Sequence, residues 1–190
     1  MKPIGQNFAN GAMQAGRSGL AIAASERSGM ESPSVLLGSG SAARLGLMIG
    51  DSRLLVDLAE AGEIAPMPSA SLILDVPLTR DWFLGVTNLR GSLFTVIDLR
   101  RFVGEGATEM TKETRLLSFA PVMNFNATIV VSRMLGLRNT ATMTETVAAA
   151  SAGKAAPWLG RCFTDADGHA WRELKLGQLA THPDFLMVGR

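Results

Sequence analysis

Residues 85–104, GVTNLRGSLFTVIDLRRFVG, decide the fold of this chain. Two apolar runs flank a short Asn-Leu-Arg-Gly turn, in which Gly91 accommodates the positive backbone angle that a tight hairpin requires. After the second run, Asp98 is placed to cap a short helical turn, and Gly104 is placed to end it. The stretch therefore predicts a β-hairpin followed by one turn of helix.

The apolar run after the turn holds two pairs of neighbouring apolar residues, Leu93 beside Phe94 and Val96 beside Ile97. A strand with one face in water alternates apolar and polar residues, whereas a strand that is buried on both faces does not need to. We therefore expect this hairpin to lie between two hydrophobic cores.

Short apolar runs bounded by turn signals also make up the rest of the chain from residue 43 onward. They lie at 43–49, 53–57, 63–66, 114–120, 126–134, 135–147 and 157–174, and residues 175–190 read as one or two short helical turns. Closely spaced short strands are typical of barrels and sandwiches, and no long amphipathic helices alternate with them as in an α/β fold. The sequence thus predicts an all-β (mainly β) domain.

The connecting segments are marked by their composition. Pro66 and Pro68 cannot donate ladder hydrogen bonds, so the strand before them must stop there or lie at a sheet edge. The polar segment 104–114 is the best internal boundary, and the small residues of 148–156 predict a loop. Gly, Ala and Ser supply 20 of the first 41 residues, which indicates a flexible tail at 1–41.

The composition indicates a globular protein without a dominant charge. The chain has 190 residues, of which 47% are hydrophobic, and its net charge is +1. Nucleic-acid binding needs clustered positive charge, so we expect no nucleic-acid partner. The lone cysteine, Cys162, fits a reducing compartment. We find neither a secretory signal nor an apolar run of about 18 residues, and therefore expect a cytoplasmic protein without membrane insertion.

No motif in the sequence carries strong catalytic or metal-binding chemistry. Residues 165–171, DADGHAW, begin like a calcium loop, but the twelfth position is Leu176 instead of a bidentate Glu, so we interpret them as a hairpin turn. Cys162 with His169 or His182 would combine a nucleophile and a base, yet a cysteine in an apolar strand is more often buried for packing. We expect no catalytic residue, no metal and no cofactor.

Arg90 projects from the tip of the predicted hairpin, and the residues alone leave two interpretations open. It is either a solvated turn arginine, because most surface charges contribute little to stability, or an arginine held by a carboxylate. In the second case it would fix two segments of the fold relative to each other, because a bidentate pair adds geometric specificity.

The run GVTNLRGSLFTVIDLRRFVG resembles the signature hairpin of the CheW family, the adaptors of bacterial chemosensory arrays. The resemblance extends upstream through 44–68 and downstream to the closing strands, and it covers about residues 43–188. We therefore predict a CheW-like domain at 42–188. The segments PLTRDWFLGVTNLRG (77–91) and PWLGRCFTDADGHAWRELKLGQL (157–179) are similar to the PilI-like branch of the family, which works in type IV pilus chemosensory systems.

The resemblance implies two SH3-like, five-stranded β-barrel subdomains with a groove between them, and a non-catalytic adaptor role. In the family the hairpin arginine pairs with a glutamate of an earlier strand, which here means Arg90 with Glu63. The implied receptor-binding groove comprises Ala61, Gly85, Val86, Asn88 and Arg90.

The partners that the resemblance implies are the cytoplasmic tip of a methyl-accepting chemoreceptor and the regulatory domain of a CheA-type histidine kinase. The implied setting is a membrane-associated receptor array in the cytoplasm that serves chemotaxis or twitching motility. Three residues depart from the family pattern, and they bear on the receptor contacts more than on the fold. They are Thr87, Thr95 and Ser132.

Two alternatives remain open at this point. The first is a ligand-binding sensor or enzyme that uses the cleft between the barrels, with arginines that bind an anionic ligand. The arginines in question are Arg80, Arg90, Arg100 and Arg101. The second is a scaffold of the same fold in a complex with another class of kinase.

Overall fold

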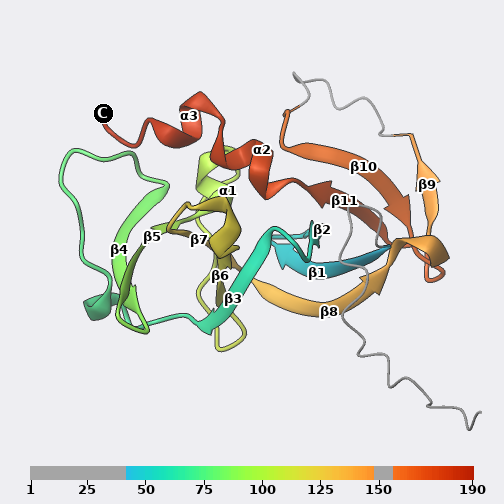
Figure 1. Ribbon diagram of the computed structural model, residues 1–190, viewed down its shortest axis with the longest axis horizontal. Helices are drawn as coiled ribbons and strands as arrows, with labels where there is room; N and C mark the ends of the chain where they lie inside the picture. The colour runs from blue at the N-terminus through green and yellow to red at the C-terminus, as the bar shows by residue number, and fades with distance from the viewer. Residues whose placement is uncertain (1–41, 148–155) are drawn as a thin grey trace, which may run out of the picture. The chain divides into compact units, whose positions relative to one another are not determined.

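The structure is a computed structural model, and it describes residues 42–147 and 156–190 (Figure 1). Within these ranges the chain forms eleven strands and three short α-helices. The strands form two sheets, which we call sheet A and sheet B. The mainly β class predicted from the sequence is confirmed. The predicted tail at 1–41 and, except for Ala156, the predicted loop at 148–156 lie outside the described residues.

Sheet A has six strands in the order β8-β1-β2-β11-β10-β9. They are β1 (Ala43–Ile49), β2 (Ser52–Asp57), β8 (Arg133–Asn139), β9 (Thr144–Thr146), β10 (Leu159–Thr164) and β11 (Ala170–Leu174). Two predicted hairpins, β1–β2 and β10–β11, are confirmed, and they join through a parallel pairing of β2 with β11. The sheet has one strand more than the resemblance implied, because the three-residue strand β9 pairs with β10.

Sheet B has five strands in the order β3-β6-β7-β5-β4. They are β3 (Ala61–Pro66), β4 (Phe83–Leu89), β5 (Ser92–Ile97), β6 (Arg115–Phe119) and β7 (Ala127–Val131). β3 is an edge strand, as the prolines predict. The decisive hairpin is β4–β5, and it pairs with β7 through β5 in parallel.

The prediction of an internal boundary at 104–114 is wrong. This segment connects the hairpin β4–β5 and its helical turn to β6, and all three strands belong to sheet B. The segment is held by Asp98, whose carboxylate accepts hydrogen bonds from the backbone N–H and the hydroxyl of Thr108 at 2.8 and 2.7 Å. A buried carboxylate thus fastens polar chain that composition alone would assign to a linker.

Three hydrophobic clusters hold the sheets. The largest combines residues of both sheets with the C-terminal helices, so it lies between the sheets; it includes Leu47, Ile129, Leu176 and Phe185. A second cluster packs on the other face of sheet B and contains Ala65, Val96, Leu116 and Val130. A third packs on the other face of sheet A and contains Leu55, Phe163 and Trp171.

The β4–β5 hairpin lies between two of these clusters, as its neighbouring apolar residues predict. Val96 belongs to the cluster of sheet B, and Ile97 belongs to the cluster between the sheets. Burying each side chain contributes roughly 1.5–3 kcal/mol. The prediction is wrong for Leu93, which is 61% exposed. This residue stands next to the turn on the same face as Ile97, where the strand has passed beyond the cluster between the sheets.

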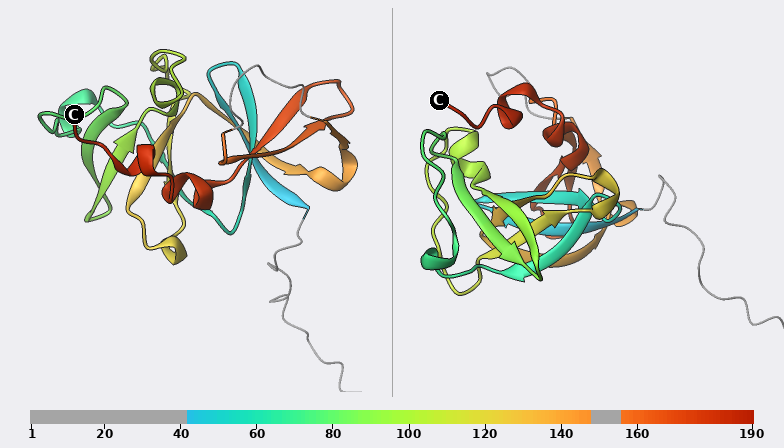
Figure 2. Two further views of the ribbon diagram at one scale, coloured as in Figure 1. Left: turned by 90° about the horizontal axis from the view of Figure 1, so that it is seen from above. Right: turned by 60° about the vertical axis from the view of Figure 1, so that its left-hand side comes forward.

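Short helices complete the fold. Helix α1 (Leu99–Phe102) has Asp98 as its N-cap, which accepts hydrogen bonds from two backbone N–H groups, and it is followed by Gly104 at a positive φ of 81°, both as predicted. Helices α2 (Leu176–Ala180) and α3 (Pro183–Leu186) lead from β11 toward β4 (Figure 2). No described helix is long and apolar enough to cross a membrane.

Candidate partner-binding surface

The tip of the β4–β5 hairpin is fixed by its backbone and by one side chain. Arg90 and Gly91 both have positive φ, 52° and 88°, which is the pattern of the hairpin turn that follows the natural twist of the strands. The Asn88 side-chain oxygen accepts a hydrogen bond from the Gly91 N–H at 2.7 Å. The direction in which Arg90 leaves the turn is therefore set by local structure.

Arg90 and Glu63 lie together in the structure, with 2.8 Å between Arg90 Nε and Glu63 Oε1. Glu63 belongs to β3 and Arg90 to the β4–β5 turn, and β3 and β4 are the two edges of sheet B. The pair therefore joins the β3 edge of the sheet to the tip of the hairpin that forms its other edge. The Arg90 side chain is 82% exposed, so the pair contributes at most about 1 kcal/mol, and its effect is mainly geometric.

A bulge in β3 aims Glu63 at the hairpin. The pairing of β3 with β6 shifts between Ala61 and Ile64, and the Glu63 N–H donates to the Ser118 hydroxyl at 2.7 Å. Gly62 is required in this bulge, because an added Cβ would lie only 2.5 Å from the same hydroxyl oxygen. The bulge therefore gives the glutamate one orientation.

Three of the predicted receptor-groove residues lie on the face of sheet B that carries the cluster between the sheets. Ala61 and Val86 are half-buried and pack against that cluster. Asn88 follows Val86 on the same face, because side chains two residues apart in a strand point the same way, and it is exposed. These residues stand on the two edge strands that the Arg90–Glu63 pair links.

Gly85 has a different environment from the other predicted groove residues. It is buried at a positive φ of 131°, and a Cβ there would lie 2.3 Å from the Leu74 carbonyl oxygen. Leu74 and Val86 exchange two backbone hydrogen bonds, at 2.8 and 2.9 Å, so the 72–74 segment covers the outer edge of β4. Gly85 thus accommodates the chain that lies over it, a role that the sequence analysis missed.

A separate cleft of about 1230 Å³ opens between the sheets, and Trp82, Phe102, Trp158 and His182 are among the residues that line it. None of the five predicted groove residues lines this cleft. Of the four arginines of the anion-binding alternative, Arg80 alone does so.

The other three arginines of that alternative are held elsewhere. Arg100 donates to the carbonyl oxygens of Glu105 and Ala107, Arg101 donates to that of Asp81, and Arg90 pairs with Glu63. The four cations therefore do not converge on one ligand.

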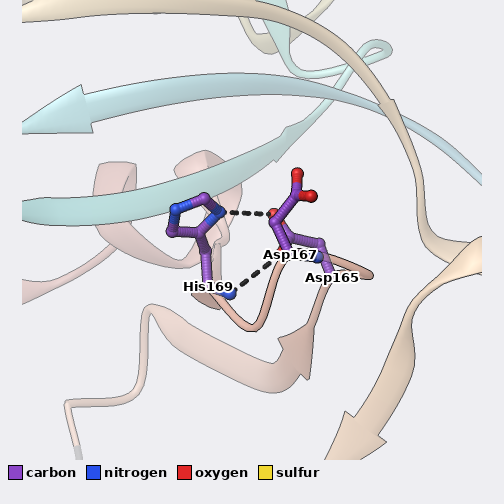
Figure 3. A group of neighbouring side chains, drawn as sticks. All are labelled: Asp165, Asp167 and His169. Atoms are coloured by element: carbon purple, nitrogen blue, oxygen red, sulfur yellow. Dashed lines mark hydrogen bonds and ion pairs between the residues drawn. The ribbon is translucent and has the colours of Figure 1, made fainter.

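The DADGHAW stretch forms the predicted hairpin turn between β10 and β11 (Figure 3). Potential ligand atoms of Asp165, Asp167 and His169 lie within 4.8 Å of one another. The Asp165 carboxylate is already used, because it accepts hydrogen bonds from the Trp171 indole at 2.8 Å and from the backbone N–H groups of Asp167 and His169. The hydrogen bond from Trp171, ahead of those from His169, lowers the pKa of Asp165 to about 2.

Cys162 lies half-buried in β10, where its apolar neighbours predict a strand.

The described residues thus form two sheets joined by one shared core, with an ion pair across the edges of sheet B and a half-buried apolar face beside it. The family model of the CheW-like domain matches residues 44–184. The chain therefore belongs to the CheW-like family, and the family prediction made from residues 85–104 is confirmed.

Individual relatives agree with this assignment. The chain is 35% identical to protein FrzA of Myxococcus xanthus over 91 residues, which are 47% of this chain and 54% of FrzA. It is 26% identical to protein PilI of Pseudomonas aeruginosa over 95 residues, which are 50% of this chain and 51% of PilI. The chain thus matches about half the length of these curated relatives.

The crystal structure of the scaffolding protein TtCheW from Thermoanaerobacter tengcongensis has a similar fold. It superimposes with a TM-score of 0.55 at 16% sequence identity, over 70% of this chain and 88% of TtCheW. Sheets A and B correspond to the two SH3-like subdomains that the resemblance implied.

Proposed function

We propose that this chain is a non-catalytic adaptor that couples a methyl-accepting chemoreceptor to a CheA-type histidine kinase. The observation that carries the proposal is the face of sheet B around Ala61 and Val86, whose two edge strands are linked by Arg90 and Glu63. Membership of the CheW-like family supports it. The adaptor would work in the cytoplasm at membrane-associated receptor arrays, and the similarity to PilI favours a pathway that controls twitching motility.

In this proposal the face of sheet B receives the tip of the receptor, and another barrel surface contacts the regulatory domain of the kinase. Interfaces of about 1,000 Å² or less suit contacts that rearrange during signalling. A few half-buried apolar residues would determine the affinity of each of the two interfaces. The protein then transmits the state of the receptor by holding two partners in register.

The test is co-sedimentation of the purified chain with a receptor cytoplasmic fragment and a CheA-type kinase from the same organism. Gly85→Asp is unsuitable as the disruptive variant, because any Cβ at this buried position meets Leu74, so the variant would displace the 72–74 segment and lose stability as well as any contact with the receptor. Val86→Thr instead removes an apolar contact at nearly constant shape, and Val122→Thr, at an exposed position of another segment, is its control.

We expect Val86→Thr to weaken binding of the receptor fragment and to leave kinase binding unchanged. The Val122→Thr control is expected to bind both partners as the wild type does. Failure of the wild-type chain to sediment with either partner would refute the adaptor role.

A second candidate is a small-molecule sensor or enzyme, which the aromatic cleft between the sheets favours. Thermal stabilisation of the chain by phosphate-bearing metabolites, lost in an Arg80→Ala variant, would support it over the adaptor. A third candidate function is a scaffold for another class of kinase. Neighbouring genes for a pilus and a CheA-type kinase would support the adaptor function, and their absence would support this third candidate.

A further inference from the structure

The connection between β3 and β4 exposes four apolar side chains, of which Leu72 ends a short 3-10 helix (Ala70–Leu72), Leu74 pairs with β4, and Leu78 lies in a turn. Leu72, Leu74, Val76 and Leu78 are 62%, 66%, 37% and 82% exposed. We call these four side chains the 72–78 strip. Four such side chains expose on the order of 400 Å², which falls in the range of the largest apolar patches on monomeric proteins, and such patches are often functional.

The strip is held firmly to the fold by hydrogen bonds of its backbone. Besides the two bonds between Leu74 and Val86, the Thr87 hydroxyl donates to the Leu72 carbonyl at 3.0 Å. At the other end, the N–H of Arg190 donates to the Leu78 carbonyl at 2.9 Å. The exposed side chains therefore stand on a defined backbone.

Leu78 combines exposure with an unfavourable backbone conformation. Its φ is 61°, in the left-handed region, which costs a residue with a Cβ on the order of 1–2 kcal/mol. A leucine side chain that is 82% exposed gains little from burial there, whereas Asn or Gly would adopt this conformation more readily. Such strain is typical of residues whose role lies in binding.

We propose that the 72–78 strip is the apolar part of the receptor-facing surface and binds the apolar face of an amphipathic receptor helix. This inference rests on the proposed adaptor function. The strip is continuous with the face of Ala61 and Val86, because Leu74 is the ladder partner of Val86 and ladder partners point to the same side of a sheet.

The geometry favours a helix over an added strand as the occupant. The backbone N–H and C=O of Val86 already bond Leu74, so a partner cannot extend the sheet at this point of β4. The partner must therefore contact the strip with its side chains, as an amphipathic helix does when it binds an apolar surface.

The area of the strip argues against a second copy of this chain. An isologous dimer built on the strip alone would bury on the order of 800 Å², whereas specific stable interfaces bury roughly 1,200–2,000 Å². A partner that also covers the neighbouring face of Val86 and Asn88 reaches a sufficient area.

The test compares a strip variant with a matched control. The strip variant is Leu74→Ser with Leu78→Asn, in which Asn suits the left-handed backbone, and both side chains are exposed, so the melting temperature is expected to stay constant. The control is Val122→Ser with Val147→Ser, two side chains that are 84% and 96% exposed on other segments. Each is titrated with the cytoplasmic helical-hairpin fragment of a chemoreceptor from the same organism and, separately, with the CheA-type kinase.

We expect the strip variant to bind the receptor fragment at least about tenfold more weakly and the kinase unchanged, while the control behaves like the wild type. If the wild type binds the fragment and the strip variant binds equally well, the inference is overturned and the adaptor function stands. The inference also fails if the strip variant loses kinase binding. It fails equally if the variant loses self-association and still binds the receptor fragment like the wild type. A wild-type chain that binds no receptor fragment overturns both.

Discussion

The faces of the two sheets that point away from the shared core are packed by different means. In sheet B this face carries aliphatic residues such as Val96 and Leu116. In sheet A it combines Trp171 with Glu173, which lies two residues further along β11 and is only 7% exposed. On these outer faces, sheet A thus combines a buried charge with aromatic packing, whereas sheet B relies on aliphatic packing and on the ion pair between its edges.

The charge network of sheet A fixes the pairing of β10 with β11. Glu173 accepts hydrogen bonds from the Arg161 guanidinium at 2.9 and 3.2 Å and from the Arg161 backbone N–H at 3.0 Å. Gly160 is needed beside it, because a Cβ there would lie 2.6 Å from a Glu173 oxygen. At the edges of sheet B the described residues include no comparable buried charge network; the edges are linked by the exposed Arg90–Glu63 pair. Sheet B is thus the sheet whose edge geometry a partner can influence most easily.

Glu173→Ala is expected to have the largest effect on stability among the changes that test this difference between the sheets. The change removes a buried carboxylate that accepts three hydrogen bonds, and because the Arg161 side chain is 50% exposed and regains water, we expect a loss of about 3 kcal/mol. Urea unfolding monitored by circular dichroism measures the loss. Glu145→Ala is the control, because it removes the exposed partner of Arg161 and is expected to cost less than about 1 kcal/mol. Equal losses for both variants would contradict the buried lock.

The second effect concerns the covered edge of sheet B. Gly85→Ala places a methyl group against the Leu74 carbonyl at a positive φ, and we expect a loss of about 2–3 kcal/mol and displacement of the 72–74 segment. Gly91→Ala is matched to it, since its φ is also positive but nothing lies within 4 Å of the added Cβ. The loss expected for Gly91→Ala is about 1 kcal/mol, the cost of a Cβ at a positive φ. If Gly85→Ala and Gly91→Ala lower the free energy of unfolding equally, the Leu74 carbonyl does not restrict the space at Gly85.

Local signals in the sequence predicted the decisive hairpin well, because its turn, its cap and its two-sided burial depend on neighbouring residues. The covering of Gly85 by Leu74 could not be predicted in this way, since it joins residues of two different segments. The exposure of Leu72 and Leu74 was equally nonlocal, because Ile73 between them is also apolar and it alone of the three packs against the cluster of sheet B.

The contact of Glu60 with α2 left no trace in the sequence. Its carboxylate accepts the backbone N–H groups of Leu176 and Gly177 at 2.7 and 3.2 Å, from a position more than a hundred residues away. The Arg90–Glu63 contact is equally nonlocal, and it was expected only because the family resemblance supplied the glutamate. Spacing alone had left a solvated arginine open.

The third effect is a pH dependence that arises in sheet A. Burial would raise the pKa of Glu173, but hydrogen bonds from Arg161 outweigh it and leave this pKa below its usual value. The pKa of Asp165 is lowered to about 2, first by the hydrogen bond from Trp171. A carboxyl with a lowered pKa stabilises the folded state above its unfolded pKa of about 4, and this contribution is lost as the pH falls through the folded pKa.

We therefore expect the melting temperature to be nearly constant from pH 7 to pH 5 and to fall below about pH 4. Asp165→Asn should be less stable than the wild type at pH 7, and the gap should narrow toward pH 2, because the carboxylate of the wild type contributes progressively less as the pH falls from the unfolded pKa to the folded pKa. Thermal melts of both proteins across this range give the answer. A gap that stays the same at every pH would show that the charge of Asp165 does not contribute.

The smallest effect on stability, and the one closest to function, concerns the edges of sheet B. Arg90→Glu and Glu63→Arg each replace the pair by like charges, and each should cost less than about 1 kcal/mol in unfolding free energy because Arg90 is exposed. Each should nevertheless weaken receptor binding, because the two edge strands that carry Val86 and Ala61 are no longer linked. The double reversal restores opposite charges and should recover part of both losses, and the recovery should shrink at 1 M salt. Strictly additive effects would mean that the two residues act separately, and the edges of sheet B would then be held by packing alone.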